Sequence, residues 1–447
     1  MINHCDCTGF TTIHGTTQLP PETGRQQETA GRGDSIVAST IHAINRLRSI
    51  VGAIAMPLIF VATSALAAGP KAYVGNFKDN TVSVIDTSTE TIIATVPVVT
   101  GPHGMVVTPD GKRIYVSGDG SSGVSLIDTA SDHVVQTIEV GKAPHGLAIT
   151  PDGKTLLVGV YGDNRVAFVD VASNTVLATL DVANPHTIAI RPDGRIAYVA
   201  SQEPGNFALV VVDLATRSVK KRVALDKPPR DPEFGYDGKA LYFTLAGVNA
   251  IQVLDPTTER VIAEVPTGVS PHLAKLYRGA ALGTAVVQGP GELQLFDPSS
   301  NLQVGAIAVG KQPHWQASND GKKVYVTNEG SNDVTVVNIS TRQTSTIPVG
   351  AAPRKVVVQP APLVTGSATV SVSNFTFSPA AIAIAAGETV TWTNDDGAPH
   401  GLTFKDGVPG VDPLLPGTNF RRSFDKPGTY EYTCSVHPYM IGRVTVN

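Results

Sequence analysis

A repeat of about forty residues runs from Lys71 to Pro360 and constrains the fold more than any other feature of the chain. One copy reads GPHGMVVTPDGKRIYVSGDGSSGVSLIDTASDHVVQTIEV, and the next reads APHGLAITPDGKTLLVGVYGDNRVAFVDVASNTVLATLDV. Each copy combines a short apolar strand, a Pro-Asp-Gly turn, a Tyr-Val type strand, a Val-x-Val-x-Asp type strand and a final alternating strand. Four short strands at a fixed period are typical of one propeller blade.

The first strand of each copy starts with His or Arg, so the number of these positions gives the number of blades. They lie 40 to 44 residues apart. The chain enters at KAYVGNFKDNTVSVID, which lacks a first strand, and the repeats end at APRKVVVQP, which supplies only a first strand. We therefore predict a seven-bladed β-propeller over residues 70–360 whose last strand closes the first blade, because closure removes exposed sheet edges. The aligned residues are His103, His145, His186, Arg230, His272, His314 and Arg354.

These aligned residues predict a ring at one mouth of the propeller channel. Its five imidazoles could bind copper or another transition metal, while Arg230 and Arg354 could orient an anionic substrate. The fourth copy also brings Asp231 and Glu233 to this mouth, as a ligand or a proton acceptor. The segments YVGN, YVSG and YVTN make the repeats resemble the YVTN family of propellers over the whole region. Because Pro-His-Gly is common in YVTN-like repeats, a purely structural role in the turn remains the alternative.

Residues 369–447 follow a linker at residues 361–368 and predict a small β-sandwich. The strands AGETVTWTN, PGTYEYTC and GRVTVN resemble a cupredoxin, and the resemblance covers this whole domain. The fold class expected for the chain is therefore all-β, a seven-bladed propeller followed by a cupredoxin sandwich.

The stretch YEYTCSVHPYM carries the chemistry of the second domain. Cys434, His437 and Met440 have the C-x2-H-x2-M spacing of amicyanin, and His400 supplies a second imidazole from an earlier strand. Two imidazoles, one thiolate and a weak axial methionine form a blue-copper electron-transfer site, so we expect one type 1 copper per domain. The resemblance to cupredoxins implies that the Gly401 amide donates to the Cys434 sulfur, and that His437 is the electron port.

Two other metal sites fit this stretch less well. A zinc site more often uses paired cysteines. A binuclear copper centre of the CuA type requires a second cysteine four residues before Cys434, where this chain has Tyr430. The residues therefore favour a mononuclear centre.

Residues 1–69 have the order expected of an export signal with an N-terminal extension. Arg46 and Arg48 precede an apolar run, which ends in small residues with Ala65-Leu66-Ala67. Cleavage after Ala67 would remove two of the three cysteines and leave one thiol in an oxidising compartment. We therefore expect a periplasmic or otherwise exported protein with no stable membrane anchor after cleavage.

The two domains together suggest two functions. In the first, the propeller ring holds a catalytic metal centre that exchanges electrons with the cupredoxin, as a copper oxidoreductase acting on a small substrate such as an anion. That layout resembles nitrous oxide reductase and thiocyanate dehydrogenase, although the chain has no CuA centre and its ring contains two arginines. In the second, the propeller is a non-catalytic docking scaffold of an electron-transfer or copper-binding protein.

The sequence also bears on the redox partner, on nucleic-acid binding and on lactonase activity. The redox partner would be a c-type cytochrome or another cupredoxin. A net charge of −4 gives no reason to expect nucleic acid. A sugar lactonase, as in other seven-bladed propellers, is disfavoured because the mouth has imidazoles instead of a carboxylate-rich calcium site.

Overall fold

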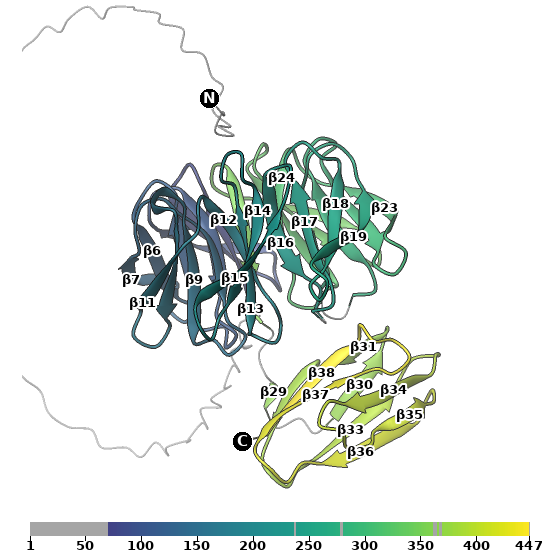
Figure 1. The fold of residues 1–447 in the computed structure, drawn as a ribbon. Helices are drawn as coiled ribbons and strands as arrows, with labels where there is room; N and C mark the ends of the chain where they lie inside the picture. The colour runs from purple at the N-terminus through teal and green to yellow at the C-terminus, as the bar shows by residue number, and fades with distance from the viewer. Residues whose placement is uncertain (1–69, 237, 278–279, 361–363, 366–368, 447) are drawn as a thin grey trace, which may run out of the picture. The chain divides into compact units, whose positions relative to one another are not determined.

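The computed structural model describes residues 70–236, 238–277, 280–360, 364–365 and 369–446. The export signal and extension expected at residues 1–69 lie outside the described residues. Within the described residues the one helix is the 3-10 turn η1 (Tyr161–Asp163), so none of them forms a helix that could cross a membrane. Everything else of regular structure is β-strand (Figure 1).

Residues 70–360 form seven sheets of four antiparallel strands, which are the blades of a propeller. The innermost strands are β28 (Pro353–Val358), β4 (Pro102–Val107), β8 (Pro144–Ile149), β12 (Pro185–Ile190), β16 (Pro229–Phe234), β20 (Pro271–Lys275) and β24 (Pro313–Ala317). The second strands are β1 (Lys71–Asn76), β5 (Arg113–Gly118), β9 (Thr155–Val160), β13 (Ile196–Ser201), β17 (Leu241–Leu245), β21 (Gly283–Val287) and β25 (Lys323–Asn328). The expected number of blades is confirmed.

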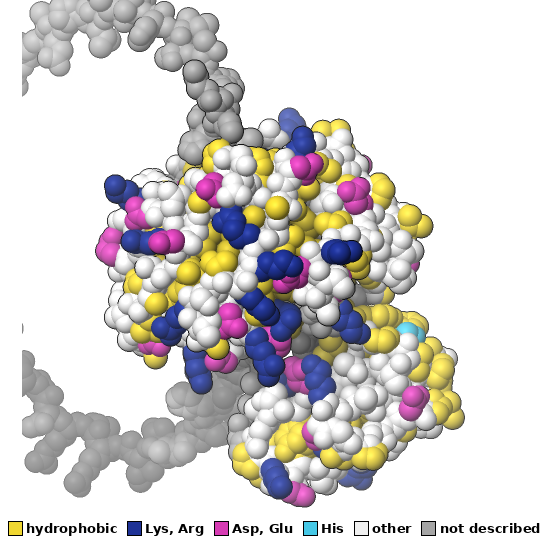
Figure 2. Space-filling model, viewed as in Figure 1, with side chains coloured by type: hydrophobic (Ala, Val, Ile, Leu, Met, Phe, Trp, Pro, Cys, Tyr) yellow, Lys and Arg dark blue, Asp and Glu magenta, His cyan; other side chains and the backbone are white. Residues whose placement is uncertain are grey.

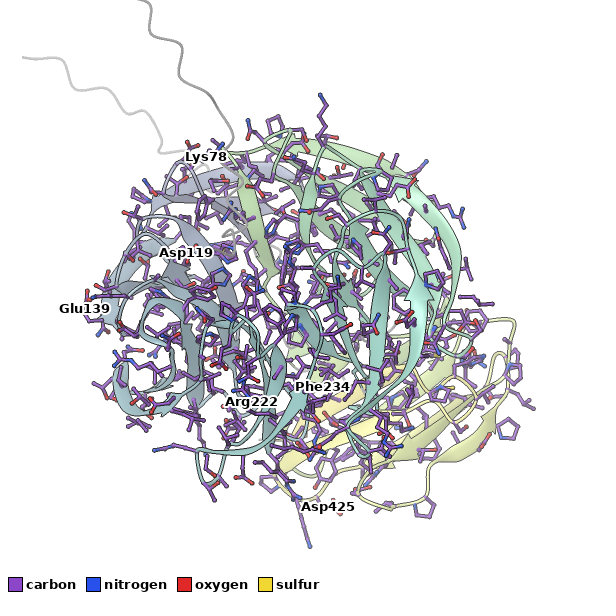
Figure 3. The ribbon with its side chains drawn as sticks, turned by 45° about the horizontal axis from the view of Figure 1, so that its top comes forward. Lys78, Asp119, Glu139, Arg222, Phe234 and Asp425 are labelled. Atoms are coloured by element: carbon purple, nitrogen blue, oxygen red, sulfur yellow. The ribbon has the colours of Figure 1, made fainter. Side chains whose placement is uncertain are left out.

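The outer half of each blade completes the sheet. The third strands are β2 (Thr81–Asp86), β6 (Gly123–Asp128), β10 (Arg165–Asp170), β14 (Ala208–Asp213), β18 (Ala250–Asp255), β22 (Glu292–Asp297) and β26 (Asp333–Asn338). The outermost strands are β3 (Thr91–Pro97), β7 (His133–Glu139), β11 (Thr175–Asp181), β15 (Ser218–Ala224), β19 (Arg260–Pro266), β23 (Leu302–Ala308) and β27 (Thr344–Pro348). In Figure 3 Glu139, at the end of outermost strand β7, lies at the rim, whereas Phe234, at the end of innermost strand β16, lies further in.

The propeller is closed by its two ends. Strand β28, the last of the repeats, pairs antiparallel with β1, the first, and Val356 faces Val74 in this register. The first blade therefore takes its innermost strand from the end of the repeat region, as the incomplete first and last copies predict. Joining the ends leaves no unpaired inner edge, which is how closed β-structures avoid exposed strand edges.

The Tyr-Val strands explain why the repeat keeps its tyrosine. Tyr73 is fully buried and donates a hydrogen bond to Asp132 in the next blade at 2.6 Å. Tyr115 does the same to Asn174 of the following blade at 2.8 Å. A buried phenol usually finds a hydrogen-bond partner, and for Tyr73 and Tyr115 that partner lies in an outer turn of the neighbouring blade. The tyrosines therefore tie adjacent blades together beyond their apolar contacts.

The C-terminal domain is a sandwich of two sheets, with strand orders β29-β32-β38-β37-β34-β35 and β31-β30-β33-β36. Their bounds are β29 (Val364–Thr365), β30 (Thr369–Ser373), β31 (Thr376–Ser378), β32 (Ala381–Ile384), β33 (Thr389–Asn394), β34 (His400–Phe404), β35 (Val411–Leu414), β36 (Asn419–Ser423), β37 (Gly428–Thr433) and β38 (Ile441–Val446). Strand β29 lies within the stretch expected to be a linker. Trp392 is fully buried between the sheets, in one apolar cluster that also contains Cys434 and Met440.

Candidate metal centres

The first candidate centre lies at one end of the sandwich core, where two strands and a loop meet. His400 is the first residue of β34, and the loop that carries the other three ligand candidates joins β37 to β38. Two backbone hydrogen bonds close this loop: the Cys434 amide donates to Met440 at 3.0 Å, and the Met440 amide donates to His437 at 2.9 Å. The loop is therefore held as a compact turn, with its ends anchored by the strands.

The side chains of this loop converge with His400. The Cys434 sulfur lies 3.6 Å from Nδ1 of His400 and 3.7 Å from Nδ1 of His437. His400, Cys434 and Met440 are at most 1% exposed, whereas His437 is partly exposed. One thiolate and two imidazole nitrogens, all within 4.8 Å of one another, fit a copper ion of the blue-copper class. The structure thus brings together the three strong ligands predicted from the sequence and buries Met440 in the same cluster.

The ligands are oriented by hydrogen bonds that the motif itself does not reveal. The Nε2–H of His400 donates to the Asp396 carboxylate at 2.9 Å, which leaves Nδ1 of the same ring for the metal. Asp396 in turn accepts from the backbone amides of Asn374 and Phe375, at 2.6 and 2.9 Å. Burial opposes ionisation of Asp396, but these amides and His400 outweigh it and lower the pKa of the carboxyl. Sequence reasoning missed Asp396, although it lies four residues before His400 in TNDDGAPH.

The Cys434 sulfur also has a hydrogen-bond donor. The backbone amide of His437 donates to Sγ at 3.3 Å. The donation expected from Gly401 stays a prediction. Gly401 lies where the register of β34 against β35 shifts, and a Cβ added there would collide with the Ser435 hydroxyl. A glycine at this position therefore lets the ligand loop pack against the start of β34.

One of the two imidazoles reaches the surface. His400 is fully buried, whereas His437 is partly exposed. The Phe375 ring, 42% exposed, lies with its centroid 4.9 Å from that of His437, and Val436 beside it is 47% exposed. Figure 2 shows a surface histidine of the C-terminal domain with hydrophobic side chains around it. This arrangement gives a partner protein close approach to one ligand of the centre.

The second candidate centre is the ring at one mouth of the propeller channel. The register of the innermost strand shifts next to its aligned residue in the blades of β4, β8, β12, β16, β20 and β24. Such bulges turn a side chain away from the regular pleat. Ring centroids of neighbouring histidines lie close together: His103–His145 at 3.8 Å, His145–His186 at 4.2 Å and His272–His314 at 4.1 Å. His103 and His314, on either side of Arg354 in blade order, are 6.0 Å apart.

Burial favours the neutral form of His103, His145, His186 and His314, and backbone carbonyls hold two of these rings. Burial lowers the pKa of His103, His186 and His314 well below its usual value, and lowers that of His145. Nδ1 of His145 lies 3.1 Å from the His186 carbonyl, and Nδ1 of His314 lies 3.0 Å from the Arg354 carbonyl. With the proton on Nδ1, both rings donate to these carbonyls and keep Nε2 as a ligand atom, which is the usual arrangement of a metal-binding histidine.

The remaining candidates at the mouth are paired within the protein. Nδ1 of His272 lies 2.9 Å from the buried carboxylate of Asp231. The Arg354 guanidinium donates to Glu329 at 3.1 Å and stacks 3.6 Å above the Phe77 ring. These three side chains thus have partners before any substrate arrives.

The other two candidates in β16, Arg230 and Glu233, are placed differently. Glu233 accepts an ion pair from Lys275 at 2.9 Å, and Arg230 lies beside Asp231 in β16.

The two centres differ in how closely their ligand atoms converge. Among the described residues, only His400, Cys434 and His437 place three ligand atoms within 4.8 Å of one another. The ring histidines approach pairwise by ring centroid without forming such a trio. The type 1 site is therefore preformed, whereas a metal at the ring would require small rotations of the imidazoles.

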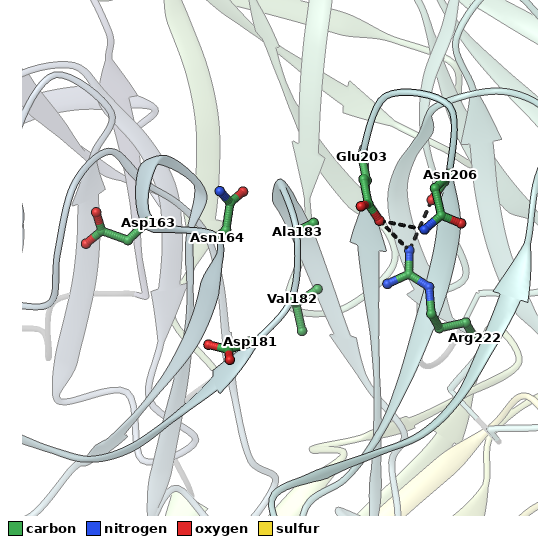
Figure 4. A pocket seen from close by; sticks show the side chains of 8 residues that line it. All are labelled: Asp163, Asn164, Asp181, Val182, Ala183, Glu203, Asn206 and Arg222. Carbon is green, nitrogen blue, oxygen red and sulfur yellow. Dashed lines mark hydrogen bonds and ion pairs between the residues drawn. The ribbon is translucent and has the colours of Figure 1, made fainter.

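A further pocket lies between the third and fourth blades and is shown in Figure 4. On one side Glu203 accepts hydrogen bonds from Arg222 at 3.0 Å and from Asn206 at 2.8 Å. On the other side Asp163 pairs with Arg165 at 3.2 Å. Because these charges are already satisfied by one another, the pocket gives no indication of a ligand.

The fold and the first centre together define a cupredoxin joined to a propeller. The plastocyanin/azurin family of copper binding proteins matches residues 364–447, and the YNCE-like beta-propeller family matches residues 51–150. Amicyanin-alpha of Methylorubrum extorquens is 41% identical over 95 residues, which are 20% of this chain and 77% of the relative. Plastocyanin of Scenedesmus fuscus is 41% identical over 83 residues, which are 16% of this chain and 85% of the relative. Through its C-terminal domain the chain belongs to the plastocyanin/azurin family, and its cofactor is type 1 copper.

Two solved structures resemble the chain over most of its length. Kuenenia stuttgartiensis hydrazine synthase aligns with a TM-score of 0.56 and 22% identity, over 60% of this chain and 92% of the other. A functionally unknown protein from Desulfotomaculum acetoxidans aligns with a TM-score of 0.57 and 16% identity, over 65% of this chain and 99% of the other. At these identities the likeness concerns the fold alone.

Proposed function

We propose that this protein is an exported copper oxidoreductase in which the propeller ring binds a second redox-active metal. When bound, copper supplies one-electron chemistry at the C-terminal centre, and there His437 offers the partly exposed edge for a redox partner. A c-type cytochrome or another cupredoxin would suit the apolar surface around His437. At the ring, the chain's own residues hold imidazoles neutral and oriented, and Asp231 fixes His272.

The observation that carries the proposal is the state of the ring imidazoles. Two of them, His145 and His314, are fixed at Nδ1 by backbone carbonyls, and Nδ1 of His272 lies 2.9 Å from the Asp231 carboxylate without hydrogen-bond geometry. Nδ1 of His186 is buried with no hydrogen-bond partner among the described residues. A buried polar nitrogen without a partner is costly, and a bound metal or water would satisfy it. A purely structural turn residue would not require several such rings facing one channel.

The alternative is an electron-transfer protein whose propeller is only a docking scaffold. It is favoured by one observation, namely that three ligand atoms converge only in the C-terminal domain of the described chain. The two functions differ in the number of metal ions that the protein holds.

Metal analysis of the full chain purified from copper-supplemented cells tests the proposal. We expect more than one copper per chain in the wild type and a loss of the additional copper in His145→Ala and His186→Ala. His133→Ala is the matched control, because His133 is an exposed residue of β7. One copper per chain in the wild type, unchanged in both ring variants, would support the scaffold alternative.

Export is supported by the sequence of residues 46–67. The protein recovered from the periplasm or medium is expected to begin at Ala68, which N-terminal sequencing can establish. Recovery of an uncleaved chain from the cytoplasm would contradict this part of the proposal.

A further inference from the structure

A cavity of about 340 Å³ lies in the propeller channel just beyond the ring. Its lining comes from the residues that follow the aligned His or Arg along the same inner strands and, after β20, from Tyr277. One wall is apolar and comes from β4, β8 and β12, with Met105, Leu147 and Ile188. The opposite wall carries Lys275, Trp315 and Lys355, together with Glu233. The cavity therefore has an apolar half and a charged half.

The two walls differ because the residue that follows the aligned His or Arg differs from one inner strand to the next. In β4 and β8 this residue is glycine, and a Cβ on Gly104 or Gly146 would collide with the carbonyl of the neighbouring blade's histidine. In β24 and β28 it is Trp315 and Lys355, and both side chains line the cavity. The same register position thus allows close packing of neighbouring blades at β4 and β8. At β24 and β28 it places large side chains in the cavity.

Lys355 is the unusual member of this lining. It is only 9% exposed, and its ammonium lies 3.0 Å from the centroid of the Trp315 ring. The two carboxylates nearby already have partners, since Asp231 pairs with His272 and Glu233 with Lys275. The Lys355 ammonium makes no hydrogen bond or ion pair with the described residues, while the backbone of Lys355 lies opposite Gly75 in the pairing of β28 with β1. The cavity thus contains one buried ammonium that forms no ion pair, although the charges of Asp231 and Glu233 attract it from a distance.

A buried ammonium without an ion pair is unfavourable, because the aromatic face and the more distant carboxylates offset the desolvation of its charge only in part. Burial lowers the pKa of Lys355 to about 7, against the opposing attraction of Asp231. An anion in the cavity would provide a counter-charge close to this ammonium. A second negative charge would find no unpaired cation beside Lys355, since Lys275 is held by Glu233.

We propose that the channel cavity binds an organic monoanion, with its charged group at Lys355 and its apolar body along the wall of Met105, Leu147 and Ile188. A small inorganic ion would leave most of the cavity and the apolar wall without contacts. A cation would meet Lys355 directly, and a dianion would carry one charge too many. The place of this anion as substrate rests on the proposed function of the ring, but its binding does not require a metal.

Isothermal titration calorimetry of the full chain with sodium benzoate tests the proposal at pH 6.5. We expect saturable binding of benzoate and weaker binding of acetate, which lacks the apolar body. Lys355→Met is expected to weaken benzoate binding by about 10–100-fold, the usual cost of losing a charged hydrogen-bond partner. Lys355→Arg is expected to retain binding, and Lys220→Met, on the exposed strand β15, should have no effect.

The controls separate this proposal from the proposed function of the ring. Lys355→Met should unfold at the wild-type temperature or above, because the variant no longer buries an unpaired charge, and its copper content should be unchanged. His186→Ala should lose the ring copper and keep benzoate binding. Equal benzoate affinity in wild type and Lys355→Met, or no benzoate binding by the wild type, would overturn the inference. Acetate binding as tightly as benzoate would overturn the role of the apolar wall.

Discussion

Asp231 and His272 form a buried pair, with the carboxylate 2.9 Å from Nδ1 of the imidazole. Asp231 is 2% exposed, and its backbone amide donates to the Thr187 hydroxyl at 3.0 Å. The pair links the ring to the layer of residues that lines the channel cavity. A carboxylate this close to Nδ1 orients the ring by charge and leaves Nε2 for a metal.

Asp231→Asn should therefore weaken metal binding at the ring. A carboxylate partner of a ligating histidine is worth about 10–100-fold in metal affinity. We expect copper titration of the variant to show that loss for the additional copper and no change in the intense absorption of the type 1 centre. An additional copper that binds Asp231→Asn as tightly as the wild type would show that the pair serves folding only.

Asp396→Asn is expected to have the corresponding effect at the type 1 centre. The asparagine can still accept from His400, but the carboxylate charge that increases the basicity of the imidazole is lost. We expect a copper affinity about 10–100-fold lower and a more positive reduction potential, measured by competition with a chelator and by redox titration. Asp395→Asn, one residue away and not bonded to His400, is the control. An unchanged potential would contradict the assigned role of Asp396.

The unequal exposure of the two type 1 imidazoles predicts which can be replaced from solution. His437 is partly exposed and His400 is 0% exposed. His437→Gly should therefore lose its blue colour and regain it when free imidazole is added. His400→Gly should not be restored in this way, because His400 is fully buried. Visible spectroscopy distinguishes the two, and restoration of both or of neither would contradict the geometry.

Gly146 should not tolerate a side chain. A Cβ there would collide with the His186 carbonyl, which belongs to the backbone and cannot rotate away. Gly146→Ala is expected to cost about 1–3 kcal/mol and to lower the unfolding temperature of the propeller. Gly305→Ala is the matched control, because its nearest neighbour is the flexible end of Arg342, and its effect should stay within about 0.5 kcal/mol. Equal stability of the two variants would refute the close packing of blades at the ring.

Benzoate binding should depend on pH through Lys355, whose pKa is lowered to about 7 by burial, with Asp231 and Glu233 raising it and Lys275 lowering it further. Only the protonated amine provides a counter-charge, so affinity is full below the pKa and falls as pH rises through it. Above the pKa of Lys355 in the free protein, and up to its pKa in the complex, the dissociation constant should rise about tenfold per pH unit. Lys355→Arg should lose this dependence, because a guanidinium stays charged. Calorimetry with benzoate between pH 6 and 9 checks both, and a flat profile in the wild type would contradict the assignment.

Much of the fold follows from local sequence signals. The Pro-Asp-Gly turns, the buried tyrosines and the incomplete first and last copies predict seven closed blades, because each unit needs its neighbour to bury its faces. The type 1 ligands could likewise be predicted, since three lie on one loop at a characteristic spacing. The blade register also predicts that the ring histidines lie near one another, and three neighbouring pairs of them have ring centroids 3.8 to 4.2 Å apart.

Asp396 and Lys355 could not be found in this way. Asp396 acts through the Nε2 atom of His400, and no spacing rule marks it among the three acidic or amide residues that precede this histidine. Lys355 stands at a register position occupied by Gly, Gly, Thr, Asp, Leu, Trp and Lys in the successive blades, so the repeat gives it no prominence. Its importance depends on interactions that only the structure shows. Arg354 pairs with Glu329 and Glu233 pairs with Lys275, so the Lys355 ammonium has no ion pair.

The central claim, that the propeller ring holds its own redox metal, is tested most directly by copper analysis of a chain without a type 1 centre. The double variant His400→Ala/Cys434→Ala removes two buried ligands of that centre and leaves the propeller untouched. We predict that this variant still binds copper, with nitrogen hyperfine structure in its electron paramagnetic resonance spectrum, and that adding His186→Ala abolishes the signal. A double variant that binds no copper would contradict the account.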